Sequence, residues 1–453
     1  MNEILILLIL VTKQRQTAQT QCRYIPHQGM GLQFVCEVKI MQKNALMLGL
    51  AVFTFVGSCS IAQAADGGEY VYVESNTSAP NSNSIYAFRR GSTGSLTPLP
   101  GSPFLTGGAG VQYNGSNLGP FDSDSEVIVN PDQTLLFAVN AGSDSVAVFS
   151  VKEDGTLVTV PGSPFPSGGN DPVSLALDGN VLIVANQSGD FARPSTILPN
   201  YTTLRVGSNG TLIPFGTTTN DTSNASQNTV SVAAGTSPSQ ALLPAGTNLL
   251  FGADFLGGLL QHFRLDGEGE LHPLSPIALP ASEFAATIPR FPLGLWSNPK
   301  APILYVGYVT ANKMGVYRYN EQGGLRFLRT VPNAGQGICW IRSNQSGTRL
   351  YTTDTTTNQV SVYDSTDAEY PIEIQTPTLS GVGNAFQLSL SNNGKSLYVL
   401  SQRAATSIPE GQGNVLHSLS IQDDGTLQEI GSGIVFNLPS GTRPQGVAVV
   451  DQE

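Results

Sequence analysis

The sequence predicts an all-β chain folded as a seven-bladed β-propeller, and three observations support this architecture. A unit of about 55 residues recurs seven times, each copy with three short apolar strands and room for a fourth. The 453 residues include 49 Gly and 29 Pro, and only 12% are charged, which suits a chain of strands and turns. The first strand that the first repeat lacks is found at the far end of the chain, where it would close a ring.

The stretch Asn130–Leu157 shows the repeated unit most clearly. It opens on the tight turn Asn130–Gln133, in which Pro presets φ and the Asn and Asp side chains bond their own backbone. The strands 135–139 and 146–151 follow, and Asp154-Gly155 turns the chain toward a third. Both faces of these strands carry apolar or small residues, so the sheet must be covered on both sides, as in a ring of blades.

The same strands can be followed along the chain. The second strands of the seven units begin at Tyr70, Leu135, Val181, Leu249, Ile303, Leu350 and Leu397. The first strands are expected at 126–130, 173–178, 240–244, 293–297, 337–343, 386–391 and, for the first blade, 445–450. A long β-sandwich or an open solenoid is the competing architecture, but neither explains why the missing strand lies at the other terminus.

The N-terminal region reads as a targeting segment ahead of one domain, residues 65–453. Residues 41–64 combine a positive start, an apolar core of about a dozen residues and the small-x-small sequence Ala62-Gln63-Ala64, as in a secretory signal peptide. Residues 1–40 are interpreted as a start-site misassignment or a disordered extension. A lipoprotein signal ending at Cys59 is the alternative. We therefore expect a periplasmic or secreted protein.

Charge and cysteine content exclude several classes of protein. The net charge of −11 and the pI of about 4.8 argue against nucleic-acid binding. The four cysteines, Cys22, Cys36, Cys59 and Cys339, show neither a C-x-x-C pair nor zinc spacing. We expect no membrane span, no cofactor and a monomer.

The connections between strands differ in length, and the difference is systematic. Turns between first and second strands are short in every unit, whereas the long connections fall in the two classes that emerge on one face of a propeller. These long connections include 106–123, 187–200, 217–237, 277–290 and 402–414. Insertions confined to one face predict a binding surface there, which we call the loop-rich face.

The repeat resembles the lactonase-type seven-bladed propellers, the family of bacterial 6-phosphogluconolactonases and carboxymuconate-lactonising enzymes. The resemblance rests on NPDQTLLFAVNAGSDSVAVFSVKEDGTL, PAGTNLLFGADFLGGLLQHFRLDGEGEL, and SNNGKSLYVLSQ with SIQDDGTL. It extends over residues 70–450 and implies a propeller fold and a lactone-hydrolysing activity.

The catalytic residues of that family are not matched in this chain. The family has His at the start of the first strand in two successive blades, and these positions fall here at Ser239 or Gln240 and at Phe291 or Gly294. Its Asn-Glu pair falls at Tyr308-Val309, and only Arg290 can be retained. The resemblance therefore leaves no imidazole or carboxylate there to activate water.

Other side chains are candidates for binding on the loop-rich face. Arg290 and Arg443 are expected to hold a carbonyl or carboxylate, with ligand contacts from Arg403, Tyr308, Ser239 and Gln240. These arginines could equally form salt bridges to Asp122, Asp124 or Asp171. The second strands of four blades end in oxygen-bearing residues that could hold Ca²⁺ in the channel or simply close their own turns, namely Asn140, Asn186, Asp254 and Asp354.

Two functional hypotheses follow. In the first, the protein is a hydrolase that opens a sugar-type or other small lactone at the channel mouth. In the second, it is a noncatalytic propeller whose long loops bind a glycan, a protein or a small ligand. The missing His and Glu favour the second hypothesis, and the family resemblance favours the first.

Overall fold

The computed structural model describes residues 18–25, 33–40, 68–112, 123–190, 192–215, 228–405 and 407–452. The chain divides into two compact units, Met1–Gln63 and Ala64–Glu453. In the first unit, β1 (Ala18–Ile25) and β2 (Gln33–Ile40) form an antiparallel hairpin. The signal sequence predicted at 41–64 lies outside the described residues and stays a prediction. The interpretation of residues 1–40 as a start-site misassignment or a disordered extension also stays a prediction.

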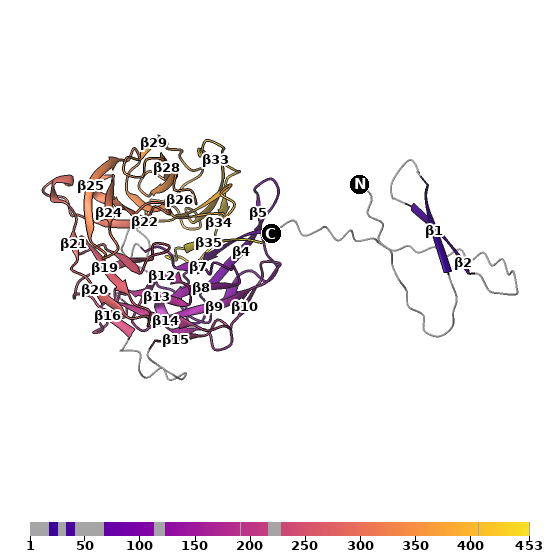
Figure 1. The fold of residues 1–453 in the computed structure, drawn as a ribbon, viewed down its shortest axis with the longest axis horizontal. Helices are drawn as coiled ribbons and strands as arrows, with labels where there is room; N and C mark the ends of the chain where they lie inside the picture. Colours follow the sequence, from indigo (N-terminus) through magenta and orange to yellow (C-terminus); the bar gives the residue numbers. More distant parts are fainter. Residues whose placement is uncertain are drawn as a thin grey trace. The chain divides into compact units, whose positions relative to one another are not determined.

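The second unit is a ring of seven antiparallel sheets, which we letter A to G in ring order (Figure 1). The first strands of neighbouring blades contact one another, so they form the inner wall of the ring. The prediction of a seven-bladed propeller is confirmed. The first strands of blades A to G are β35 (Gln445–Asp451), β7 (Val127–Val129), β12 (Pro172–Asp178), β17 (Pro238–Leu242), β22 (Pro292–Ser297), β26 (Ile338–Ser343) and β30 (Asn384–Leu390).

The remaining strands of each blade follow outward in chain order. The second strands are β3 (Glu69–Glu74), β8 (Leu135–Asn140), β13 (Val181–Asn186), β18 (Leu249–Asp254), β23 (Ile303–Tyr308), β27 (Arg349–Asp354) and β31 (Ser396–Gln402). The third strands are β4 (Ser84–Arg90), β9 (Ser145–Val151), β14 (Asn200–Val206), β19 (Leu259–Leu265), β24 (Lys313–Tyr319), β28 (Gln359–Asp364) and β32 (Val415–Ile421). The fourth strands are β5 (Leu96–Pro98), β10 (Leu157–Thr159), β15 (Leu212–Pro214), β20 (Leu271–Pro273), β25 (Leu325–Pro332), β29 (Ile372–Gln375) and β33 (Leu427–Glu429).

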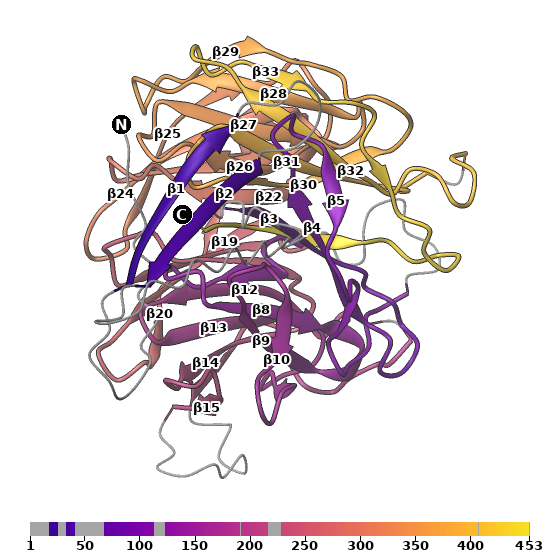
Figure 2. The ribbon, with the colours of Figure 1, turned by 90° about the vertical axis from the view of Figure 1, so that its right-hand side faces the viewer.

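The C-terminal strand closes the ring as the sequence predicts. β35 pairs antiparallel with β3, with Tyr70 opposite Val450. On the other side of this blade, Val71 and Val73 pack against Tyr398 and Leu400 of blade G, beside which β3 lies in Figure 2. Such apolar layers fill every junction between blades, and burying each large side chain contributes about 1.5–3 kcal/mol. The closed ring therefore leaves no inner strand edge exposed.

The sequence did not predict that the outer strand is broken in five blades. A short extra strand continues beyond the fourth strand and pairs with the start of the third, namely β6 (Phe104–Leu105), β11 (Phe165–Pro166), β16 (Thr229–Ser231), β21 (Ile277–Ala278) and β34 (Ile434–Val435). At the break in blade A, Ser102 Oγ accepts a hydrogen bond from Ala87 N at 2.9 Å. Ser163 does the same for Val148 in blade B at 2.8 Å. A serine hydroxyl thus takes the place of a missing backbone acceptor.

Within the described part of the chain, the helical elements with defined bounds are short 3-10 turns. These are η1 (Ala141–Ser143), η3 (Ala281–Glu283) and η4 (Val309–Ala311). Among the described residues, no helix is long and apolar enough to span a membrane.

Candidate functional site

The segment Ser123–Glu126, which leads into β7 of blade B, lies across the middle of the ring. Its backbone accepts hydrogen bonds from Leu175 N of blade C and from the Gln387 side chain of blade G, at 3.0 and 2.9 Å. It donates one to the Ser239 carbonyl of blade D at 3.1 Å. A segment that touches blades on both sides of its own must occupy the channel. We call it the channel segment.

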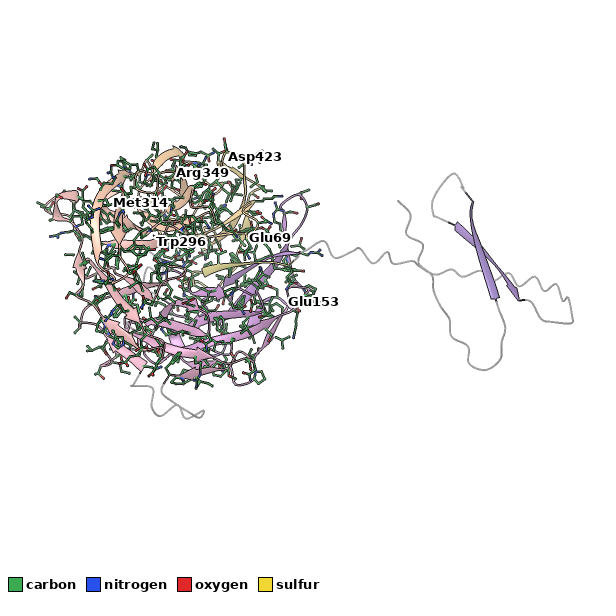
Figure 3. All side chains as sticks on the ribbon, viewed as in Figure 1. Glu69, Glu153, Trp296, Met314, Arg349 and Asp423 are labelled. Atoms are coloured by element: carbon green, nitrogen blue, oxygen red, sulfur yellow. The ribbon has the colours of Figure 1, made fainter. Side chains whose placement is uncertain are left out.

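A buried ion pair fixes the channel segment to the opposite wall. Arg342 of β26 donates from Nη1 and Nη2 to both carboxylate oxygens of Asp124, at 2.7 and 2.9 Å. The side chain of Asp124 is only 2% exposed and that of Arg342 12%. The guanidinium also lies 4.8 Å from the centre of the Trp296 ring, which is near the middle of the propeller in Figure 3. This bidentate, desolvated pair fixes the position of the segment.

The predicted pairing of Asp124 with Arg290, Arg403 or Arg443 is therefore wrong, since Arg342 takes that place. Arg342 could not be singled out from the sequence, because it lies 218 positions from Asp124 and in another blade. Asp122 lies outside the described residues.

Two further carboxyl groups are buried nearby, that of Glu126, the last residue of the channel segment, and that of Glu74 in blade A. Burial, with the nearby Asp124 charge, raises the pKa of Glu126 to about 8, although Ser123 and Gln387 donate hydrogen bonds to it. Burial also raises the pKa of Glu74, the last residue of β3, and the Glu126 charge adds to this effect. Among the described residues, Oε2 of each has no hydrogen-bond partner. Perturbed carboxyl groups of this kind gather at functional sites.

Two predicted ligand contacts, Ser239 and Gln240, lie in the channel but are held by the protein itself. The Gln240 amide binds the backbone of Leu295 in the next blade through both its oxygen and its nitrogen, at 2.5 and 3.1 Å. Its nitrogen also donates to Asp124 at 3.1 Å. The Ser239 hydroxyl donates to the Ala253 carbonyl. Gln240 thus ties blades D and E together.

Tyr308, another predicted ligand contact, lies within the blade and not on its surface. Its ring is buried, and its hydroxyl is hydrogen-bonded to that of Tyr317. Burial, with the Tyr317 hydroxyl beside it, raises the pKa of Tyr308 well above its usual value. This phenol stays neutral and is fully engaged with its neighbour.

The three predicted arginines lie at the loop-rich face but in different blades. Arg290, just before β22, is exposed, and its Nη1 donates to the Leu279 carbonyl at 3.2 Å. Arg403 closes the long loop of blade G by pairing with Glu410 at 2.9 Å. Arg443 precedes β35 in blade A and is half-buried. Blades A and E are not adjacent, so Arg290 and Arg443 stand at separate positions around the ring.

The four predicted metal ligands are each the last residue of a second strand, and all are fully buried. Each forms hydrogen bonds within its own surroundings, although Oδ1 of Asn186 has no partner among the described residues. Asn140 accepts hydrogen bonds from Asn83 and Thr106 of blade A, and Asn186 donates to Asn200. Asp354 accepts from Asn333 and Ser361 at 2.7 Å each, and burial raises its pKa to about 7. The structure thus distributes these side chains over four blades and gives each a role in holding its loop.

Asp254 differs from Asp354, the other carboxylate of the four, because one of its oxygens has no hydrogen-bond partner among the described residues. Its Oδ1 accepts from the backbone N–H groups of Ser237 and Gly257, at 2.8 and 2.9 Å. Its Oδ2 has no hydrogen-bond partner among the described residues, and burial raises its pKa. The turn that follows, 255–258, packs on the next blade, where a Cβ at Gly258 would lie 2.7 Å from the Arg290 carbonyl. One turn therefore joins Asp254 to the exposed Arg290, and Phe255 lies against Phe291 with ring centres 4.4 Å apart.

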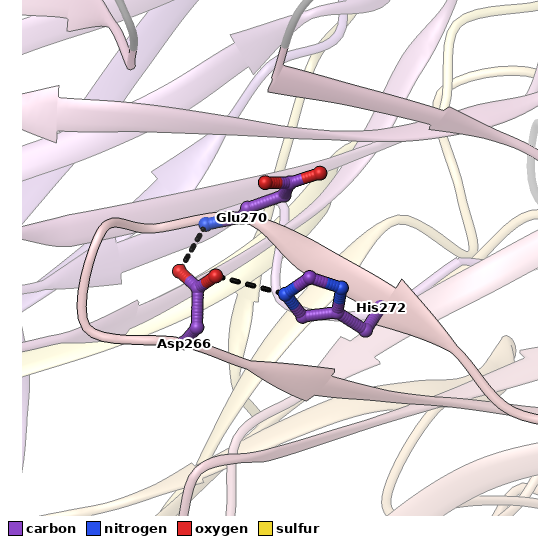
Figure 4. Close-up of side chains that lie close together, drawn as sticks. All are labelled: Asp266, Glu270 and His272. Atoms are coloured by element: carbon purple, nitrogen blue, oxygen red, sulfur yellow. Dashed lines mark hydrogen bonds and ion pairs between the residues drawn. The ribbon is translucent and has the colours of Figure 1, made fainter.

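Three side chains that could hold a metal ion lie in the turn between β19 and β20, and this turn is held by its own hydrogen bonds. Asp266 accepts from the backbone N–H of Glu270 at 2.9 Å and from His272 Nε2 at 2.8 Å (Figure 4). It also accepts from the backbone N–H of Glu268 at 2.9 Å. The three side chains of Asp266, Glu270 and His272 are exposed and close enough to share a cation. The Asp266 carboxylate nevertheless has a full set of partners from its own hairpin.

Comparisons with known proteins agree with this fold. The model of the family named Lactonase, 7-bladed beta-propeller, matches residues 82–204, so the chain resembles that family. A Bacteroides uniformis protein, solved under the provisional name 6-phosphogluconolactonase, aligns with a TM-score of 0.63, 16% identity and coverage of 85% of this chain and 100% of its own. The periplasmic gluconolactonase PpgL of Pseudomonas aeruginosa aligns with a TM-score of 0.60, 17% identity and the same coverage. A protein of Lactobacillus plantarum gives a TM-score of 0.60 at 14% identity, with 85% and 100% covered. No curated protein sequence matches the chain.

Proposed function

We propose that this protein opens a small lactone by hydrolysis at the loop-rich face, beside the turn between blades D and E. The observation that carries the proposal is that one turn of a lactonase-type ring, 255–258, follows the buried carboxyl group of Asp254 and packs on the backbone of Arg290, whose side chain is exposed. The solved relatives include a protein called a periplasmic gluconolactonase, which supports a sugar-type lactone as the substrate class.

The chemistry divides between these two groups. The Arg290 guanidinium stabilises the oxyanion that forms when water attacks the lactone carbonyl. Asp254, through its unpartnered Oδ2, takes the proton of the attacking water. The ring C–O bond then breaks, and the leaving alkoxide takes up the proton, so lactone and water give one hydroxy acid. Because burial raises the pKa of Asp254, its ionised form is a stronger base than an exposed aspartate.

Turnover of a lactone panel by the purified chain tests this proposal. We expect hydrolysis above the spontaneous rate, reduced about 10²-fold or more in Arg290→Ala because a donor to the oxyanion is lost. Arg326→Ala is a matched control, since Arg326 is an exposed arginine on β25. Wild-type turnover equal to background for every lactone, or an equal loss in both variants, would overturn the proposal.

A second function, binding without catalysis, is favoured by one specific observation. Gln240 and Tyr308 occupy positions at which the resembled family has catalytic residues, yet both are committed to hydrogen bonds within the ring. The protein would then bind a glycan or other small ligand through the loops of the same face. Saturable binding of a lactone or sugar with no acid release would establish this function in place of hydrolysis.

We also propose that the chain is exported to the periplasm or secreted. The signal pattern of residues 41–64 supports export, and so does the location in the name of the Pseudomonas aeruginosa relative. Expression of the full-length chain followed by N-terminal sequencing of the extracytoplasmic fraction tests the proposal. We expect a mature chain that begins at Ala65; a chain that stays in the cytoplasm with residues 41–64 attached would refute export.

A further inference from the structure

Three buried oxygen atoms at the junction of blades A and B have no hydrogen-bond donor among the described residues. They are Oε2 of Glu74, Oε2 of Glu126 and Oε1 of Gln445. Glu74 and Glu126 are fully buried, and Gln445 is 2% exposed. Buried polar atoms are nearly always satisfied in folded proteins, so a group of three acceptors without a donor calls for an explanation.

Backbone pairing and a bridging amide bring the three side chains together. Glu74 lies directly opposite Gln445 in the antiparallel pair β3–β35, which places both side chains on the same face of the sheet. The amide of Gln387 then links this pair to Glu126. Its nitrogen donates to Glu126 Oε1 at 2.5 Å, while its oxygen accepts from the backbone N–H of Gly446, next to Gln445, at 2.8 Å.

A second set of hydrogen bonds links the two glutamates through Asn83 and Val139. Asn83 Nδ2 donates to Glu74 Oε1 at 2.6 Å and to the Val139 carbonyl at 3.2 Å. The N–H of Val139 donates in turn to the Glu126 carbonyl at 3.0 Å. Glu74 and Glu126 are therefore held around the same point by two independent sets of bonds.

A further buried amide is bonded to the backbone next to Gln445. Gln402, the last residue of β31, donates from its nitrogen to the Pro444 carbonyl at 2.8 Å, one residue before Gln445. Its Oε1 is also buried without a donor among the described residues. The four side-chain atoms of blades A, B and G left unpaired here are thus all oxygens, from two carboxylates and two amides.

Among the described residues, no cationic side chain offsets the charge of Glu74 or Glu126. Asp124, the nearest other carboxylate on the channel segment, is already paired with Arg342. Two buried carboxylates without a cationic partner cost several kcal/mol each, so they must take up protons or bind a cation.

We propose that Glu74, Glu126 and Gln445, with Gln402 beside them, bind a Ca²⁺ ion that joins the first two blades at the point where the ring closes. Carboxylate and amide oxygens are the ligands that Ca²⁺ prefers, and its charge equals that of the two carboxylates. Zn²⁺ would favour nitrogen or sulfur ligands, and Mg²⁺ would keep several water molecules that a fully buried site does not admit. The four side chains are distinct from Asn140, Asn186, Asp254 and Asp354. The site does not depend on the proposed hydrolysis.

Metal content and thermal unfolding test the site directly. The chain is treated with EDTA, dialysed at pH 8 and titrated with CaCl₂, MgCl₂ or NaCl. We expect native mass spectrometry to show one bound Ca²⁺ per chain. We also expect Ca²⁺, and not the other two salts at equal ionic strength, to raise Tm by about 3–6 °C near saturation.

Glu126→Gln keeps the shape of the side chain and removes its charge, so this variant should lose the Ca²⁺-dependent rise in Tm. Glu270→Gln is the control, because Glu270 belongs to the exposed turn with Asp266 and His272. It should keep the full response. Loss of the response in Glu270→Gln and not in Glu126→Gln would move the site to the rim. A wild-type chain without bound Ca²⁺ or a Ca²⁺-dependent Tm would overturn the proposal and show that protons neutralise the glutamates. If Glu126→Gln does not fold, the mass measurement on the wild type decides alone.

Discussion

Removing Arg342 should destabilise the ring more than removing any exposed arginine. In Arg342→Ala, the Asp124 carboxylate stays 2% exposed but loses its counter-ion and two hydrogen bonds of 2.7 and 2.9 Å. Leaving a buried charge without its partner costs about 3–5 kcal/mol, and the lost contact with the Trp296 ring adds about 1 kcal/mol. We expect the free energy of unfolding to fall by about 4–6 kcal/mol.

Urea unfolding followed by tryptophan fluorescence measures this loss. Arg318→Ala is the matched control, because Arg318 also pairs with a carboxylate, that of Glu369, but its side chain is 50% exposed. Exposed pairs contribute about 0–1 kcal/mol, so this variant should be nearly neutral. The double variant Arg342→Met with Asp124→Asn should recover much of the loss, because it removes the uncompensated charge. Equal stability of Arg342→Ala and Arg318→Ala would refute the conclusion that this ion pair fixes the channel segment.

Three further predictions concern pH and backbone geometry. Without divalent cations, the free energy of unfolding should fall as pH rises from about 4.5 through about 8, because burial raises the pKa of Glu126 to about 8. The difference between the folded and unfolded pKa values corresponds to about 4–5 kcal/mol. Glu126→Gln should flatten this pH dependence when stability is measured by urea unfolding. Burial alone would raise the pKa of Glu429, but hydrogen bonds led by that from His417 outweigh it and lower the pKa, so the ionised group stabilises the fold above pH 4.5 and this stabilisation is lost as pH falls. Glu429→Gln should therefore have a lower free energy of unfolding than wild type at pH 7 and approach the wild-type value in acid. A difference in free energy that stays constant with pH would contradict this. Gly294→Ala should lower the free energy of unfolding by at least about 3 kcal/mol, because φ at Gly294 is +67° and the new Cβ would meet a backbone carbonyl of blade F. Gly267→Ala is the control, since the space around Gly267 is open and its Tm should change little. Equal Tm values for the two variants would contradict the close approach of blades E and F.

The blades could be predicted from the sequence because their signals are local. The turn at Asn130 and the apolar runs after it placed β8 and β9 within one residue of their observed bounds. The pairing of the last strand with the one that begins near Tyr70 followed from counting, since six repeats had a first strand and one did not. Turn chemistry and strand periodicity act over a few residues, so one sequence is enough to read them.

The middle of the ring could not be predicted because its contacts join distant parts of the chain. Asp124 and Arg342 are 218 positions apart, and Glu126 and Gln387 are 261 apart. Nothing in either neighbourhood marks these side chains as partners, and only closure of the ring brings them together. The sequence did locate the long connection that ends at Ser123, but it could not show that the residues after it enter the channel.

In the candidate site, too, the positions of the residues could be predicted from the sequence, but their contacts could not. The positions Ser239, Gln240 and Tyr308 were found by counting along the repeats, and the structure places them in or beside the inner wall. Their bonds to Leu295, Ala253 and Tyr317 depend on how neighbouring strands pack, which a single sequence does not encode locally. The link between Asp254 and Arg290 also became visible only through the turn that lies between two blades.

The most direct test of the proposed hydrolysis is the rate of acid release from a sugar-type lactone, recorded in a pH-stat at constant pH with wild-type protein and with Asp254→Asn. Asn keeps the hydrogen bonds from Ser237 and Gly257 to the side-chain oxygen but cannot take a proton. We expect release by the wild type above the spontaneous rate and a fall of about 10²-fold or more in kcat for the variant, with its Tm preserved. Equal kcat for the two proteins, or no release above the spontaneous rate by either, would contradict it.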